Sequence, residues 1–251
     1  MAAFAARFAR SFSKGRYRVR FATEAEDIAA AQRLRARAFR GEGAGLDADD
    51  FDARSIHVLV EDAQGGELVC CYRLMAFASG AEIASSYSAQ FYGLDALRDY
   101  PGPMVEMGRF CIDPARRDPD ILRIAWGAMV RYVDAHGVEM LFGCSSFHGA
   151  DAEAHLAALD LLRERHLAPK RWLPRIKAPR VFRFGRRRDK PDLKAAQRAM
   201  PPLLRTYLMM GGWVSDHAVV DDDLDTLHVF TGLEIKGIPP MRQKLLRASA
   251  V

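Results

Sequence analysis

The chain has 251 residues, of which 49% are hydrophobic, and a formal net charge of +5. This length allows one large domain or two small ones with a sizeable core. No window approaches the roughly 20 uninterrupted apolar residues of a membrane-spanning helix, and scattered cations interrupt the start of the chain where a secretory signal would be apolar. We therefore expect a globular cytoplasmic protein that is neither exported nor inserted across a bilayer.

The four cysteines lack the spacing typical of a metal site or a disulfide framework. They lie in apolar, strand-like runs at Cys70, Cys71, Cys111 and Cys144. We expect small core residues with free thiols in a reducing compartment, and no bound metal.

The first fourteen residues place Phe4, Phe8 and Phe12 four positions apart, with cations between them. In a helix, this spacing would make an aromatic stripe flanked by positive charge, which suits a membrane interface. A frayed or core-packed terminus fits the pattern equally well, because short isolated helices are marginal in water.

The next elements are a strand and a helix. Alternation over residues 17–21 predicts a strand with one buried face. Thr23 can then cap a helix, with Glu26 at the capping-box position, and this helix should end near Gly41 or Gly43.

Residues 57–61 and 68–75, separated by a glycine turn, predict a β-hairpin. A further strand is expected over residues 104–112. Asp118 followed by Pro119 is typical of a helix start, and the apolar periodicity after it continues to Gly137.

A short buried strand is expected at residues 140–144, so strand, helix and strand predict a right-handed parallel crossover. Asp151 opens another helix. A helix from Pro201 and two strands, one from Trp213 and one over residues 227–230, complete the chain. The order predicts an α/β fold, a mixed sheet with helices on its faces.

Positive charge concentrates between Arg163 and Lys190, where twelve Lys or Arg residues meet two acids. Prolines and aromatic residues interrupt this basic segment. We expect an exposed, loop-rich surface that attracts a polyanion such as an acidic protein or an anionic membrane. A solvated basic surface without a dedicated partner is the alternative.

Several short motifs resemble known acyltransferases. Four motifs occur in the order and approximate spacing of the acyl-homoserine-lactone synthases: Arg35 with Phe39, residues 49–52, Arg73-Leu74 and residues 106–110. Three later motifs more closely resemble the ornithine-acyl carrier protein N-acyltransferases of ornithine-lipid synthesis: residues 142–151, 166–169 and 202–214. The lactone synthases' usual tryptophan shortly after Phe39 is missing, which favours the ornithine branch.

The resemblance implies a GNAT-like fold with a mixed central sheet, flanking helices and a C-terminal helix and strand extension. It divides the chain into an N-terminal basic and aromatic segment at 1–16, an acyltransferase core at 17–168, and a basic loop segment with the extension at 169–251. The implied reaction is transfer of a (3-hydroxy)fatty acyl group from acyl carrier protein to the α-amino group of ornithine, giving lyso-ornithine lipid.

Aminolysis of a thioester requires a base for the acceptor amine and donors for the developing oxyanion. Glu106 is the candidate base, and Arg109 is assigned to the catalytic site with it. An ion pair between Glu106 and Arg109 that merely closes the sheet is the alternative. A bulge at Gly108 would open a slot for the thioester carbonyl.

A second group, Arg35, Asp49, Asp52 and Arg73, can match the carboxylate and ammonium groups of an amino acid. The resemblance implies acceptor binding or loop ordering for these residues; the bland alternative is a solvated acidic loop. The remaining predicted substrate-binding residues are Phe39, from its motif, and Ser145 and Phe147 near the acyl chain.

The donor prediction rests on residues 115–120, which lack the glycines that coenzyme A-dependent GNAT proteins usually carry there. The helix start and two arginines can still attract a phosphate, so we expect acyl-phosphopantetheine on acyl carrier protein and no bound cofactor. Carrier docking is assigned to Arg171, Arg175, Lys177 and Arg180.

Two other functions remain open. The first alternative is an acyl-homoserine-lactone synthase. The second is a non-catalytic module that binds an anionic membrane or another polyanion through the basic segment. No nucleic-acid reader motif is present, and nucleic acid is not an expected partner.

Overall fold

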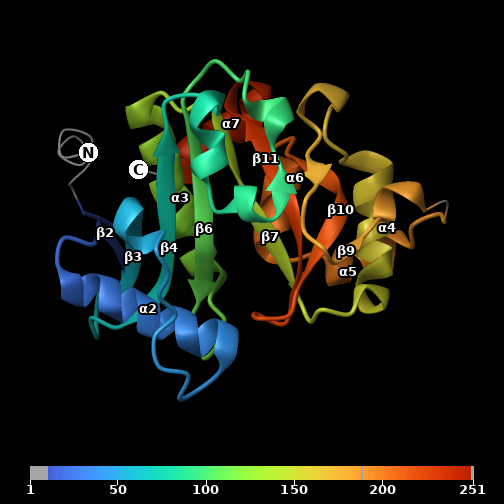
Figure 1. The fold of residues 1–251 in the computed structure, drawn as a ribbon. Coiled ribbons are helices and arrows are strands. Elements are labelled where there is room, and N and C mark those ends of the chain that lie inside the picture. Colours follow the sequence, from blue (N-terminus) through green and yellow to red (C-terminus); the bar gives the residue numbers. More distant parts are fainter. Residues whose placement is uncertain (1–10, 188, 250–251) are drawn as a thin grey trace. The chain divides into compact units, whose positions relative to one another are not determined.

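The computed structural model describes residues 11–187 and 189–249, which fall into two units. Of these residues, the first unit contains 11–76, 107–138 and 240–249, and the second contains 77–106, 139–187 and 189–239. The predicted division of the chain at residues 17 and 169 stays a prediction. Figure 1 labels the elements.

In its described residues, the first unit combines antiparallel strands with helices α2, α3 and α7, and its strand order is β1-β2-β3-β4-β6. The predicted hairpin is confirmed, because β3 pairs antiparallel with β4. The strands are β1 (Phe12–Lys14), β2 (Tyr17–Phe21), β3 (Ile56–Asp62), β4 (Leu68–Phe77) and β6 (Met104–Ile112). The helices are α2 (Ala25–Arg40), α3 (Pro119–His136) and α7 (Pro240–Ser249).

The second unit contains a mixed sheet in the order β6-β7-β11-β10-β9 and a small pair, β5-β8. Residues Met104 to Glu106 of β6 pair with β7 in parallel, as predicted, while β11 pairs antiparallel with β7 and β10. The strands are β5 (Tyr92–Gly93), β7 (Met140–His148), β8 (Arg175–Ile176), β9 (Val181–Phe182), β10 (Trp213–Asp221) and β11 (Thr226–Glu234). The helices are α4 (Leu156–Arg165), α5 (Leu193–Ala199) and α6 (Pro202–Met209).

The start of α2 differs from the prediction by one position. Glu24, not Thr23, is the N-cap, and Asp27 supplies the reciprocal bond of the capping box. Arg20 holds the Asp27 carboxylate at 2.6 Å, and this hydrogen bond, working against burial, lowers the pKa of Asp27 to about 2. The helix ends at Gly41, the first of the two predicted end positions, with a φ of 91°.

The start and end of α3 agree with the prediction. The Asp118 carboxylate accepts a hydrogen bond from the Asp120 N–H, Pro119 occupies the first turn, and Gly137 ends the helix in the left-handed region with φ of 60°. Elements without strong sequence signals were not predicted: β1, the short strands β5, β8 and β9, helices α5 and α7, and several one-turn helices between residues 80 and 97.

Each unit has its own apolar core. In the first, Leu34 of α2 packs with Leu59, Cys71 and Cys111 from the sheet. In the second, Phe147 packs with side chains of α4, α6, β10 and β11. All four cysteines are free thiols as predicted; three are buried and Cys144 is partly exposed.

The predicted aromatic stripe at the start of the chain falls largely outside the described residues, which exclude Phe4 and Phe8. Phe12 begins β1 and stacks with Arg131 of α3, whose guanidinium carbon lies 3.9 Å from the ring centroid. Across residues 11–187 and 189–249, no helix combines the length and apolar character needed to span a bilayer.

Candidate active site

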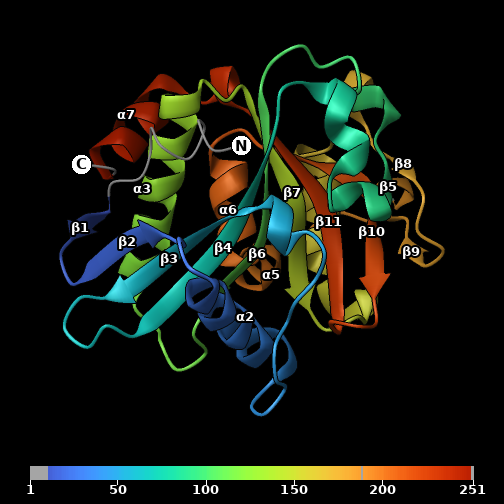
Figure 2. The same ribbon diagram turned by 60° about the vertical axis from the view of Figure 1, so that its left-hand side comes forward.

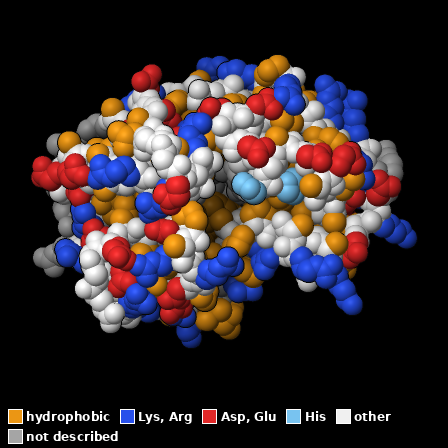
Figure 3. Space-filling model, turned by 90° about the horizontal axis from the view of Figure 1, so that it is seen from below, with side chains coloured by type: hydrophobic (Ala, Val, Ile, Leu, Met, Phe, Trp, Pro, Cys, Tyr) orange, Lys and Arg blue, Asp and Glu red, His pale blue; other side chains and the backbone are white. Residues whose placement is uncertain are grey.

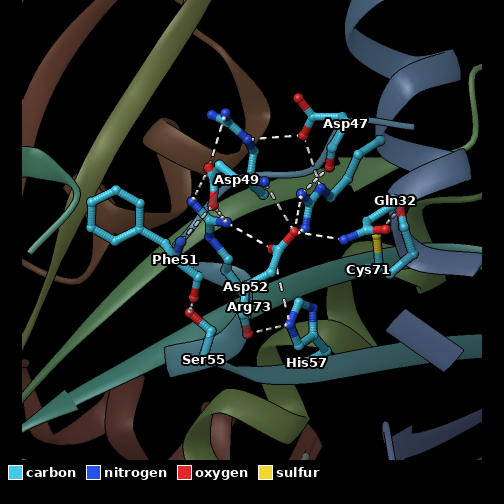
Figure 4. Close-up of polar contacts among 12 residues, drawn as sticks. Gln32, Asp47, Asp49, Phe51, Asp52, Ser55, His57, Cys71 and Arg73 are labelled. Carbon is cyan, nitrogen blue, oxygen red and sulfur yellow. Dashed lines mark hydrogen bonds and ion pairs between the residues drawn. The ribbon is translucent and has the colours of Figure 1, made fainter. Parts of the chain in front are cut away.

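A buried ionic network in the first unit joins three arginines to three aspartates. Figure 4 shows Asp47, Asp49, Asp52 and Arg73 of this network with dashed lines marking their polar contacts. Helix α2 supplies Arg35, β4 supplies Arg73 and β6 supplies Arg109, and the aspartates come from the loop after α2. These three aspartates are Asp47, Asp49 and Asp52.

Arg35 is bound on two sides by this loop. Its Nε lies 2.9 Å from Asp47 Oδ2, and its Nη1 lies 2.7 Å from Asp52 Oδ1. Arg35 also donates to the backbone carbonyl of Asp47. Arg35 is only 1% exposed, so its guanidinium is enclosed by these loop contacts.

Arg73 and Arg109 complete the network. Arg73 donates to Asp49 Oδ2 and to Asp52 Oδ1, both at 2.8 Å, while Arg109 Nε lies 3.0 Å from Asp47 Oδ2. The Arg109 and Asp49 side chains are 12% and 24% exposed. They are therefore the members of this six-residue network most accessible to a small ligand.

The solvated-loop alternative is wrong for part of the loop. Asp47 and Asp52 are 4% and 6% exposed, whereas Asp50 is exposed. The arginines on α2 and β4 supply the counter-charges that allow the two carboxylates to be buried.

The pKa of Asp52 reflects two opposing effects. Burial alone would raise it, but hydrogen bonds from Arg35 and Gln32, with the charge of Arg35, hold the pKa well below its ordinary value. Burial would also raise the pKa of Asp49, but the hydrogen bond from Arg73 together with the charges of Arg73 and Arg109 lowers it overall. Burial lowers the pKa of the neighbouring His57, whose Nε2 lies 3.1 Å from the Asp52 carbonyl oxygen.

The backbone of β6 is distorted at Arg109, which has a φ of 52°. The predicted site of distortion was Gly108, which is not in the left-handed region. This conformation is uncommon for a residue with a side chain. The Arg109 side chain donates hydrogen bonds to the carboxylates of Asp47 and Asp49.

Glu106 is held in the second unit by neutral donors. Its Oε2 accepts a hydrogen bond from the Tyr87 N–H at 2.8 Å. Its Oε1 accepts bonds from the N–H and the hydroxyl of Ser88 at 2.7 and 2.5 Å. Glu106 is 3% exposed, so these donors fix the orientation of a buried carboxylate.

Two further side chains lie near Glu106 and its partner Ser88, namely Tyr207 near Glu106 and Cys144 beside Ser88. Ser88 Oγ lies 3.4 Å from Cys144 Sγ. Burial, followed by the nearby Glu106 charge, raises the pKa of Tyr207 well above its ordinary value. Sequence analysis did not assign Ser88 or Tyr207 to the site. Residues 86–88 lie in a stretch without periodicity, where only the clustered hydroxyl side chains could have served as a signal.

The other predicted substrate-binding residues are part of the packed interior. The buried Ser145 hydroxyl accepts a hydrogen bond from Thr231 Oγ1 at 2.9 Å, Phe147 lies in the core of the second unit, and Phe39 packs at the edge of the core beneath α2. Their roles in substrate binding stay predictions.

The basic segment contains many internal partners. Arg171 lies 3.4 Å from Glu234, Arg180 pairs with Asp222, and Lys177 donates to the Ala89 carbonyl at 2.6 Å. Figure 3 shows Lys and Arg interspersed with Asp and Glu at the right-hand edge, the side where Figure 1 shows α4, α5 and β9. The four predicted docking cations, including Arg175, all belong to exposed residues.

The family model for the acetyltransferase (GNAT) domain matches residues 31–127. This region contains α2 from residue 31 onward, the ionic network and the strand that carries Glu106. The mixed sheets, their flanking helices and this match define an acyltransferase with a GNAT-type fold.

Curated relatives give a narrower assignment. The chain is 37% identical to the L-ornithine N(alpha)-acyltransferase of Rhodobacter capsulatus, covering 85% of this chain and 88% of the relative. Identity to the Brucella abortus L-ornithine N(alpha)-acyltransferase is 33%, covering 89% and 86%. Among solved structures, the chain is similar to the AHL synthase LasI, with 13% sequence identity and a TM-score of 0.43. The match covers 88% of this chain and 92% of the LasI chain. The chain belongs to the family of L-ornithine N(alpha)-acyltransferases, which confirms the resemblance identified from its motifs.

Proposed function

We propose that the protein transfers a (3-hydroxy)fatty acyl group from acyl carrier protein to the α-amino group of L-ornithine, giving lyso-ornithine lipid. The observation that carries the proposal is the similarity along most of the chain to proteins named L-ornithine N(alpha)-acyltransferase. A buried carboxylate on a central strand, held by three donors, supplies a candidate base for this reaction.

The proposed reaction is direct aminolysis. The deprotonated α-amine attacks the thioester carbonyl carbon, a C–N bond forms, and collapse of the tetrahedral intermediate breaks the C–S bond. Glu106 accepts the first proton from the α-ammonium, through water or the Ser88 hydroxyl. The departing thiolate takes the second proton, which the nitrogen loses as it becomes an amide, and this restores the carrier thiol. A hydroxyl can both accept and donate a proton, so Ser88 is suited to the relay.

The ionic network is assigned to the acceptor. Arg35 and Arg73 order the aspartate loop, since both are buried and bound to its carboxylates. Arg109 and Asp49, the more exposed members, are proposed to contact the α-carboxylate and the side-chain ammonium of ornithine. Each would exchange part of an existing ion pair for one with the substrate.

The proposed donor is acyl-phosphopantetheine on acyl carrier protein, and no resident cofactor is required. An acidic carrier would dock on Arg171, Arg175, Lys177 and Arg180. We include an anionic membrane surface among the partners, because the product is amphiphilic.

The test is a mass-spectrometric assay of the purified chain with 3-hydroxyacyl carrier protein and separate ornithine, lysine, glutamine and S-adenosylmethionine reactions. The expected product is N-acyl-ornithine, and it should disappear in Glu106→Gln. Preferential formation of another acyl amino acid would overturn the proposed acceptor. Formation of an acyl-homoserine lactone would identify a lactone synthase instead, and absence of acyl transfer from the folded protein would support a binding module.

A further inference from the structure

Helix α7 presents an apolar stripe to solvent. Met241 and Leu245, one turn apart, are 68% and 55% exposed, and exposed Ala248 continues the same face. Within residues 11–187 and 189–249, Met241 and Leu245 are the two most exposed large hydrophobic side chains. Transfer of this stripe from water into an apolar medium would be favourable, because apolar surface would leave water.

Cations flank the stripe. At 3.6 residues per turn, Arg242 and Lys244 project to opposite sides of the Met241 and Leu245 face, and both are exposed. Helix α7 contains no acidic residue. An apolar face bordered by Lys and Arg is typical of a helix that lies in the plane of a membrane interface.

The orientation of α7 within the first unit is fixed by polar contacts. Arg247 donates to Asp134 of α3 at 3.0 and 3.1 Å, and Lys14 of β1 donates to the Ala248 carbonyl at 2.9 Å. Figure 2 shows α7 beside α3. These contacts hold the opposite side of the helix against its unit, so Met241 and Leu245 remain outward.

We propose that α7 binds an anionic lipid surface. The stripe enters the boundary between headgroups and acyl chains, and the flanking cations bind lipid phosphates. This interaction goes beyond the acyl-transfer reaction and does not depend on it.

Lipid fits α7 better than a protein partner does. A single convex helix provides no groove for a complementary side chain, whereas a fluid apolar layer conforms to it. A symmetric second copy seated on the stripe would bring Arg242 and Lys244 of two chains together, and these like charges would repel. An acidic protein would neutralise the cations without requiring the apolar stripe between them.

The test is sedimentation of the full chain with vesicles of phosphatidylcholine alone or mixed with phosphatidylglycerol, at low and high salt. Wild type should bind the anionic vesicles. Met241→Ser combined with Leu245→Ser should weaken this binding by about tenfold or more, since burial contributes about 0.8 kcal/mol per CH₂. Lys244→Glu should weaken it severalfold.

The matched control for Leu245→Ser is Leu193→Ser on α5, because both remove an exposed leucine. Leu193→Ser should bind vesicles as wild type does. Thermal melts test folding, and acyl transfer with a soluble donor is measured separately. The proposal is overturned if wild type does not bind anionic vesicles, if the double variant binds equally well, or if light scattering shows that the stripe mediates only self-association.

Discussion

The ionic network of the first unit and the Glu106 site of the second both bury negative charge, but they stabilise it differently. Asp47 and Asp52 face arginine guanidinium groups, whereas Glu106 accepts hydrogen bonds from two backbone N–H groups and a hydroxyl. Opposite charges favour permanently ionised carboxylates. The three neutral donors orient the Glu106 carboxylate, which suits the proposed role as a proton acceptor.

Because the two sites stabilise negative charge differently, mutations in them should have different effects. A change at the neutral-donor site should affect turnover more than stability, and a change at the centre of the ionic network should affect stability first. Without Arg35, the buried Asp47 and Asp52 would each lose one guanidinium partner and keep another, Arg109 or Arg73.

The largest expected effect is on turnover. Glu106→Gln should reduce kcat by about 10²- to 10⁴-fold, the range typical of losing a general base. Quenched-flow or steady-state acyl transfer measures the rate, and circular dichroism tests folding. Glu164→Gln on α4 is the matched control, because Glu164 is exposed. Comparable losses in both variants would contradict a base role for Glu106.

The largest stability effect should follow Arg35→Met. We expect the free energy of unfolding to fall by about 3–5 kcal/mol, because Asp47 and Asp52 would lose a buried counter-charge. Urea unfolding measures it. Arg33→Met on the same helix is the control, since Arg33 pairs on the surface with exposed Glu26, and it should cost under about 1 kcal/mol. Equal losses would mean that burial of the network contributes little.

Acid should affect the two units over different pH ranges. Burial, followed by repulsion from His217, lowers the pKa of His228 in the second unit to about 4. Because the folded state disfavours the protonated imidazole, the free energy of unfolding is highest above the unfolded histidine pKa of about 6.5. It falls as pH decreases from about 6.5 to about 4, by on the order of 3 kcal/mol, because the unfolded chain binds the proton first. Urea unfolding at several pH values should show this loss diminish in His228→Gln.

The first unit should respond at lower pH. The lowered pKa values of Asp49 and Asp52 contribute stability above the unfolded aspartate pKa of about 4, which is lost as pH falls through the folded values. Asp52→Asn should flatten that acidic limb and leave the His228 limb unchanged. A single transition altered equally by both variants would contradict this separation.

Removing the Ser88 hydroxyl should have a smaller effect. Ser88→Ala leaves the two backbone N–H donors to Glu106, so we expect kcat to fall about tenfold, equivalent to the loss of one hydrogen bond to a charged group. Ser88→Thr should recover part of the rate if the hydroxyl is the relevant group. The pH–rate profile provides a further readout, since a purely packing role would leave its shape unchanged.

The smallest expected effect is at the basic surface. Arg180→Ala should change the free energy of unfolding by less than about 1 kcal/mol, because its pair with Asp222 is exposed. The proposed carrier role predicts a severalfold higher KM for acyl carrier protein with little change in kcat. An unchanged KM, together with unchanged KM values for Arg171→Ala and Lys177→Ala, would contradict docking on this segment.

Local signals in the sequence determined the main elements. Alternation identified β2, the hairpin was evident on both sides of its glycine turn, and Asp118, Pro119 and Gly137 delimited α3. These signals depend on backbone geometry over a few residues. The sequence also identified the acyltransferase resemblance and placed Glu106, Arg109 and the Arg/Asp residues among its candidates.

Only the tertiary structure decided which groups neutralise each charge. Glu106 and Arg109 are three residues apart, yet Glu106 is bound by Ser88 and Arg109 by Asp47. Sequence spacing could not predict these partners, because the donors come from segments distant in the chain. The outward face of α7 was also decided by tertiary contacts, since the same apolar spacing would serve equally well for a helix packed against a core.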